Sequence, residues 1–72
     1  MDLLLESEQG FVAIECKMTS HPSRKDFKAI CNLSPLLDKP LLAGFVVSTA
    51  NAVRRFDAGI PLYSVPAPWL LS

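Results

Sequence analysis

The sequence predicts a small α/β domain in which a strand hairpin is followed by a crossover helix and a buried third strand. Two short apolar segments, 1–6 and 11–17, flank the turn sequence Ser7-Glu8-Gln9-Gly10, a pattern typical of a hairpin. Residues 24–33 carry apolar side chains at helical spacing, and residues 41–49 form the most apolar run of the chain. One or two short strands in the last third of the chain complete the expected sheet.

The chain has 72 residues, half of them hydrophobic, and its formal net charge is zero. This composition is that of one packed globular piece. A domain of this size buries only about 60–65% of the surface of its unfolded chain. We therefore treat residues 1–72 as a single domain. We expect further apolar burial against a second copy or against the missing part of a larger protein.

Composition also bears on location and partners. Zero net charge gives no general case for nucleic-acid binding. No basic region is followed by a long apolar stretch, and the longest apolar run, 41–47, is far shorter than the roughly 20 residues of a membrane span. We expect a cytoplasmic protein without membrane contact, whose Cys16 and Cys31 are reduced and buried in the core.

The register of the hairpin determines which side chains meet. Pairing Glu6 with Phe11 places Asp2 opposite Glu15, and a slip of one residue would separate these acids. Side chains alternate between the faces of a strand, so Glu15 and Lys17 share a face. The opposite face is uniformly apolar and is predicted to be the core: Leu3, Leu5, Val12, Ile14 and Cys16. The first face is mixed: Asp2, Leu4, Ala13, Glu15 and Lys17.

Ser23 and Asp26 have the spacing of a box that caps the start of a helix, predicted over residues 24–33. Its basic side chains are expected on the exposed side, as weak nucleic-acid contacts: Arg24, Lys25 and Lys28. Residues 41–49 lack polar alternation, which favours a parallel strand buried on both faces. Residues 53–56 are predicted as a short edge strand. Residues 60–65 include Pro61 and either rejoin the sheet or lie along it.

Asp2, Glu15 and Lys17 are the candidate catalytic residues. Two carboxylates at adjacent strand ends repel each other unless a cation lies between them, and Mg²⁺ or Mn²⁺ suits such oxygen ligands. The metal ligands would be Asp2 and Glu15, with Lys17 acting on a water molecule or on a phosphate. The alternative is that Glu15 and Lys17 form a solvent-exposed ion pair, worth at most about 1 kcal/mol.

The same residues carry a resemblance to a known family. Asp2, the turn, and Glu15-Cys16-Lys17 resemble the core motif of the PD-(D/E)XK nuclease superfamily. More narrowly, the chain resembles the C-terminal domain of unknown function found on many bacterial and archaeal AAA-type ATPases. The resemblance spans essentially the whole chain and includes three further stretches: Ser23-Arg24-Lys25-Asp26-Phe27, Gly44-Phe45-Val46-Val47, and Arg54-Arg55-Phe56-Asp57-Ala58-Gly59-Ile60-Pro61, the last leading to Val65-Pro66 and Trp69-Leu70.

The resemblance implies a restriction-endonuclease-like fold and a Mg²⁺- or Mn²⁺-dependent endonuclease acting on DNA. It also implies a truncated domain, because the superfamily core has a helix and a strand before the residue that corresponds to Asp2, and the larger relatives carry an ATPase domain. Truncation would remove activity if Asp2 is poorly held. The alternative is a non-catalytic interaction or assembly module, associated with an AAA-type ATPase and docking by its apolar surface. In either case we expect a homodimer.

Overall fold

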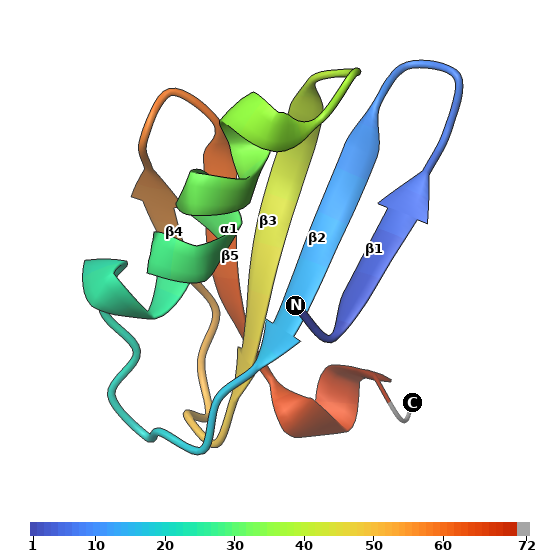
Figure 1. Cartoon of the computed structure of the whole chain (residues 1–72). Coiled ribbons are helices and arrows are strands. Elements are labelled where there is room, and N and C mark those ends of the chain that lie inside the picture. Colours follow the sequence, from blue (N-terminus) through green and yellow to red (C-terminus); the bar gives the residue numbers. More distant parts are fainter. Residues whose placement is uncertain (71–72) are drawn as a thin grey trace.

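A computed structural model describes residues 1–70 as a five-stranded mixed sheet with one helix packed across one face (Figure 1). The strand order is β1-β2-β3-β5-β4. The strands are β1 (Leu3–Glu6), β2 (Phe11–Cys16), β3 (Leu41–Ser48), β4 (Arg54–Asp57) and β5 (Pro61–Pro66). The helical elements are η1 (Arg24–Phe27), α1 (Lys28–Leu33), η2 (Ser34–Leu36) and η3 (Ala67–Leu70). The α/β class predicted from the sequence is confirmed.

The hairpin and the crossover have the predicted arrangement. Strands β1 and β2 are antiparallel, with Glu6 paired to Phe11 and Leu4 paired to Ala13, which is the predicted register. Strand β3 is parallel to β2, so the chain crosses the sheet through η1 and α1 between the two. The hairpin therefore brings the Asp2 position to the end of β2 that carries Glu15.

Strand β5 lies between β3 and β4. It is parallel to β3 and antiparallel to β4, which forms the edge of the sheet as predicted for residues 53–56. Pro61 is the first residue of β5, a position where a strand tolerates the missing N–H. Because β2, β3 and β5 all run in the same direction, their carboxyl ends meet at one end of the sheet (Figure 1).

The predicted helix over residues 24–33 is divided into a 3₁₀ turn, η1, and a short α-helix, α1. The backbone N–H of Ser23 donates to Asp26 Oδ2 at 2.8 Å, which fixes the start of η1. The basic side chains of these two elements are exposed, as predicted: Arg24, Lys25 and Lys28. Phe27 and Ile30 instead point into the core and are 1% and 0% exposed.

The predicted core face of the hairpin is wrong. Leu3 and Leu5 are 47% and 49% exposed and Cys16 is exposed, whereas Ala13, on the face predicted to be mixed, is fully buried. The helical layer packs over Ala13 and Gly44, whose small size allows α1 to approach the sheet closely. An added Cβ on Gly44, which pairs with Ala13, would lie only 2.9 Å from Ile30 Cγ2. The core cluster comprises Phe11, Ala13, Phe27, Ile30, Leu41, Val46 and Leu62.

The other side of the sheet, here called the open face, is apolar and faces away from α1. The register assigns to it Leu3, Leu5, Val12, Ile14, Cys16, Ala43, Phe45, Val47, Arg55, Tyr63 and Val65. Phe45 and Tyr63 stack at 5.5 Å between ring centroids. Toward the carboxyl ends of β3 and β5, Val47 and Val65 are buried, whereas the hairpin end of the face is exposed. The third strand is therefore only partly buried on this side, contrary to the prediction.

The two faces of β3 should respond differently to added volume. Gly44→Ala would place a methyl group 2.9 Å from both Ile30 Cγ2 and Leu62 Cδ2. We expect it to lower the free energy of unfolding by about 1–3 kcal/mol through overpacking. Ala43→Val, one residue earlier and on the open face, should change it by less than about 0.5 kcal/mol. Urea denaturation of both variants checks this, and equal effects would contradict the assignment of the faces.

Candidate carboxylate–lysine site

The candidate site lies where the carboxyl ends of the parallel strands meet. In open α/β sheets, ligands bind outside the carboxyl ends of the strands. Glu15 is the penultimate residue of β2 and pairs with Val46 of β3, which pairs in turn with Ser64 of β5. Lys17 follows β2 directly, and its backbone N–H donates to Val47 O at 2.8 Å, which extends the ladder by one bond.

Glu15 faces the helical side of the sheet, and its side chain is only 13% exposed. Lys17 Nζ lies 3.9 Å from Glu15 Oε2, beyond hydrogen-bond distance. Glu15 Oε2 is buried and has no hydrogen-bond partner among the described residues. The ion pair of the alternative prediction is therefore present, but only half of it is exposed: Lys17 is 43% exposed, whereas the Glu15 carboxylate is largely withdrawn from water.

Asp2 lies just before β1, opposite Glu15 in the register of the hairpin. Its Oδ2 accepts a hydrogen bond of 2.7 Å from the backbone N–H of Cys16. This N–H points from β2 toward β1, but Cys16 lies beyond the last paired residues, Leu3 and Ile14, so no backbone group of β1 pairs with it. Asp2 is thus tied to the end of β2 through one carboxylate oxygen, which gives a residue near the chain terminus a defined position.

Two buried serines at this end of the sheet were not predicted as site residues. Ser64 is 0% exposed, and its Oγ has no hydrogen-bond partner among the described residues. It lies in the same row as Glu15, with Val46 between them, so strand spacing puts the two positions about 9–10 Å apart. Ser48 is 2% exposed, and its Oγ accepts from Ala50 N–H at 3.2 Å. The sequence signal that could have identified them is a serine at a core-facing position of an otherwise apolar strand.

The carboxylates at this end of the sheet are the candidate ligands of the predicted divalent metal. Within residues 1–70, no group of three or more His, Cys, Asp or Glu side chains is arranged to hold a metal ion. Mg²⁺, however, is commonly bound by only one or two carboxylates, with water and substrate oxygens as the other ligands. Such a site would need one ion to reach both Glu15 Oε2, which has no hydrogen-bond partner among the described residues, and the carboxylate of Asp2, of which Cys16 N–H occupies one oxygen.

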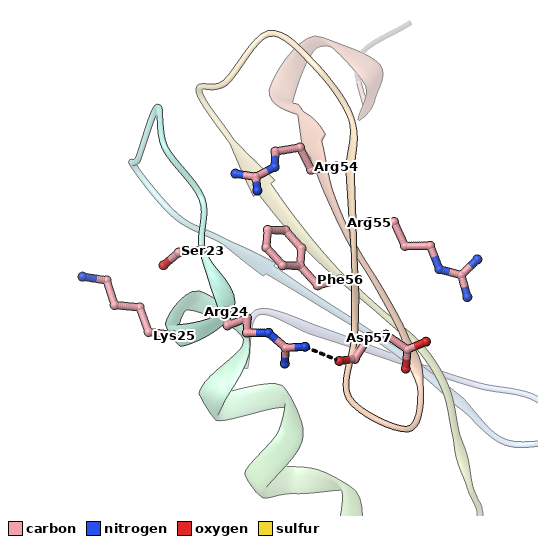
Figure 2. A pocket seen from close by; sticks show the side chains of 7 residues that line it. All are labelled: Ser23, Arg24, Lys25, Arg54, Arg55, Phe56 and Asp57. Carbon is pink, nitrogen blue, oxygen red and sulfur yellow. Dashed lines mark hydrogen bonds between the residues drawn. The ribbon is translucent and has the colours of Figure 1, made fainter.

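A basic pocket of about 620 Å³ lies between η1 and the edge strand β4 (Figure 2). Arg24 Nη2 donates to Asp57 O at 2.8 Å, and Arg54 Nη1 donates to Pro22 O at 3.2 Å. Both acceptors are backbone carbonyl oxygens, so neither of these hydrogen bonds is an ion pair. The pocket is lined by Ser23, Arg24, Lys25, Arg54, Arg55, Phe56 and Asp57. It includes two of the three predicted nucleic-acid contacts, while Lys28 lies outside it.

The two cysteines are free, as predicted, but the prediction that both are buried is wrong. Cys16 is exposed because it ends β2 on the open face, and Cys31 on α1 is partly buried against the core. Among residues 1–70, no helix has the length and apolar character needed to cross a membrane.

Comparison of the chain with protein-family models, curated proteins and solved structures gave no match. The class of the protein is given by its fold, a small mixed α/β domain. Its distinguishing feature within that class is a buried carboxylate beside a lysine, at the carboxyl ends of the parallel strands.

Proposed function

We propose that the chain is a nuclease-like domain of the PD-(D/E)XK type that acts on phosphodiester bonds of DNA with Mg²⁺ or Mn²⁺. The observation that supports this most is the buried Glu15 carboxylate, whose Oε2 has no hydrogen-bond partner among the described residues and lies 3.9 Å from Lys17 Nζ. A buried acceptor without a hydrogen bond is costly. A metal ion in direct contact would satisfy it more fully than the Lys17 ammonium does at 3.9 Å.

Asp2 and Glu15 are the residues that would hold the ion. When bound, the ion supplies Lewis-acid polarisation of a phosphodiester oxygen and a water molecule of lowered pKa. Lys17 contributes a positive charge on the same side of the sheet, placed to stabilise the negative charge that develops on the phosphate. Asp2 is oriented by its hydrogen bond from Cys16 N–H, and Lys17 by its backbone bond to Val47 O.

Titration of Mn²⁺ by calorimetry tests the proposed metal site without requiring activity. The wild-type chain should give saturable binding that is lost in Glu15→Gln and weakened in Asp2→Asn, since each variant removes one carboxylate charge. Glu8→Gln, in the exposed hairpin turn, is the matched control and should bind as the wild type does. Binding that survives Glu15→Gln, or no binding at all, would contradict the metal site.

A second candidate function is a non-catalytic assembly module, in the setting of an AAA-type ATPase that the sequence resembles. The open face favours it. Sheets with parallel strands usually have both faces covered. Here α1 covers one face, and within residues 1–70 the open face is buried toward the carboxyl ends of β3 and β5 but exposed at the hairpin. Leu3 and Leu5 on the open face are about half exposed, at 47% and 49%. A small domain buries little apolar surface within itself, which limits its stability. Burying this surface against a partner would add to that stability.

A further inference from the structure

Strand β1 is an open edge of the sheet and is unusually apolar for that position. Its residues Leu3, Leu4 and Leu5 are 47%, 37% and 49% exposed. Edge strands in natural proteins usually carry a proline, a lysine or a bulge that prevents pairing with another strand. Strand β1 is short, at four residues, and ends at the charged Glu6, which are two other forms of edge protection. It nevertheless contains no proline, lysine or bulge, and its pairing with β2 is regular over all four residues. This edge is therefore competent to accept a further strand.

The hydrogen bonds around the hairpin show which groups of β1 point outward. Ser7 N–H donates to Gly10 O, so Ser7 bonds toward β2. Cys16 N–H points toward β1, and Phe11 N–H points away toward Pro40 O. Antiparallel strands alternate between bonded and non-bonded pairs. The N–H and C=O groups of Leu3 and Leu5 thus face β2, and those of Leu4 face the open edge.

We propose that a second copy of this chain pairs antiparallel with β1 about a two-fold axis at Leu4, forming one sheet that runs through both copies. This rests on the assembly function proposed above and names a second copy as its partner; the contact is made by the edge of β1, and the open face stays uncovered. Leu4 exchanges both backbone hydrogen bonds with Leu4 of the second copy. Leu3 then lies opposite Leu5 of the second copy, which joins the two open faces into one apolar surface.

Charge is compatible with this pairing. The axis brings Asp2 opposite Glu6 of the second copy, where two bare carboxylates would repel. Lys39 Nζ, however, donates to Glu6 Oε2 at 2.8 Å and to Ser7 O at 3.2 Å. The hydrogen bond to the Glu6 carboxylate raises the pKa of Lys39, so this cation stays charged. Asp2 of each copy therefore approaches an ion pair rather than a lone negative charge.

Cysteine cross-linking tests the register, in a Cys16→Ser, Cys31→Ala background. A bonded antiparallel pair has a Cα separation of about 5.5 Å, which a disulfide spans. Leu4→Cys should therefore form a covalent dimer under mild oxidation. Leu3→Cys and Leu5→Cys are matched controls and should not cross-link alone, because each thiol is offset from its copy by about 6–7 Å along the strand. An equimolar mixture of those two variants should cross-link.

Analytical sedimentation of variants without the introduced cysteines measures the oligomeric state independently of cross-linking. Leu4→Pro removes the outward N–H of β1 and should convert the dimer to a monomer, while Leu4→Met should remain a dimer; circular dichroism checks that both are folded. A wild-type monomer at all concentrations would overturn the proposal. A dimer that persists in Leu4→Pro, or that cross-links at other positions, would place the interface elsewhere. Either result would also overturn the proposal. Mn²⁺ titration is independent of both readouts, so the metal site and the dimer can fail separately.

Discussion

Lys17→Ala is expected to reduce metal-dependent DNA cleavage by about a hundredfold to a thousandfold, the usual effect of removing one group that stabilises transition-state charge. Lys17 Nζ is the cation beside the buried Glu15 carboxylate, at 3.9 Å from Oε2. Alanine removes that charge and leaves the backbone bond from Lys17 N–H to Val47 O in place. The measurement is the initial rate of nicking of supercoiled DNA with Mn²⁺, with EDTA as the blank.

Two variants accompany Lys17→Ala. Met18→Ala alters the neighbouring side chain, which is 94% exposed, and should leave the cleavage rate unchanged. Lys17→Arg keeps the positive charge and should retain part of the activity. Cleavage that persists in Lys17→Ala at the wild-type rate would assign the activity to a contaminant or to a different site. In that case the assembly function would become the leading proposal.

Phe27→Ala should have the largest effect on stability, a loss of about 3–5 kcal/mol in the free energy of unfolding. Phe27 is 1% exposed, and its ring centroid lies 5.1 Å from that of Phe56 on β4. It is the buried side chain of η1 and packs this turn onto the sheet. Domains are stable by about 0.05–0.15 kcal/mol per residue, or roughly 4–11 kcal/mol for a chain of this length. The variant should therefore be partly or wholly unfolded at 25 °C.

Thermal and urea denaturation followed by circular dichroism measure this loss. Leu36→Ala is the control, since Leu36 is 79% exposed and its truncation should change stability by less than about 0.5 kcal/mol. A Phe27→Ala variant with nearly wild-type stability would mean that η1 does not pack against the sheet in solution.

The order of the first elements and the hairpin register could be predicted because local signals determine them. The turn at residues 7–10 fixes which residues pair, and pairing by position then places Asp2 opposite Glu15. The covered face could not be predicted in this way, because both faces of the hairpin carry leucines. The helix packs where small residues leave room, and Gly44 lies thirty-one positions after its partner Ala13. Such a long-range match is visible only once β2 and β3 are side by side.

The residues of the candidate site were predicted from the sequence, but the burial of Glu15 and the neighbouring Ser64 were not. Glu15 and Lys17 share a face because strand side chains alternate with a two-residue period. The distance of 3.9 Å between Lys17 Nζ and Glu15 Oε2 depends on the side-chain conformations, which the period does not determine. The burial of Glu15 was not predicted, because the core was expected on the opposite face of the hairpin. Ser64 was missed because the position of β5 between β3 and β4 has no local signal.

The place of β5 in the sheet has a consequence for how the chain is made. A ribosome releases β1, β2, α1 and β3 first, and β3 then presents an unpaired apolar edge until residues 61–66 emerge and insert beside it. Parallel pairing closes slowly, since a loop must be ordered before its contacts form. During that interval a nascent chain exposes a template for aggregation. Shortening the chain before β5 should therefore yield insoluble protein rather than a smaller domain.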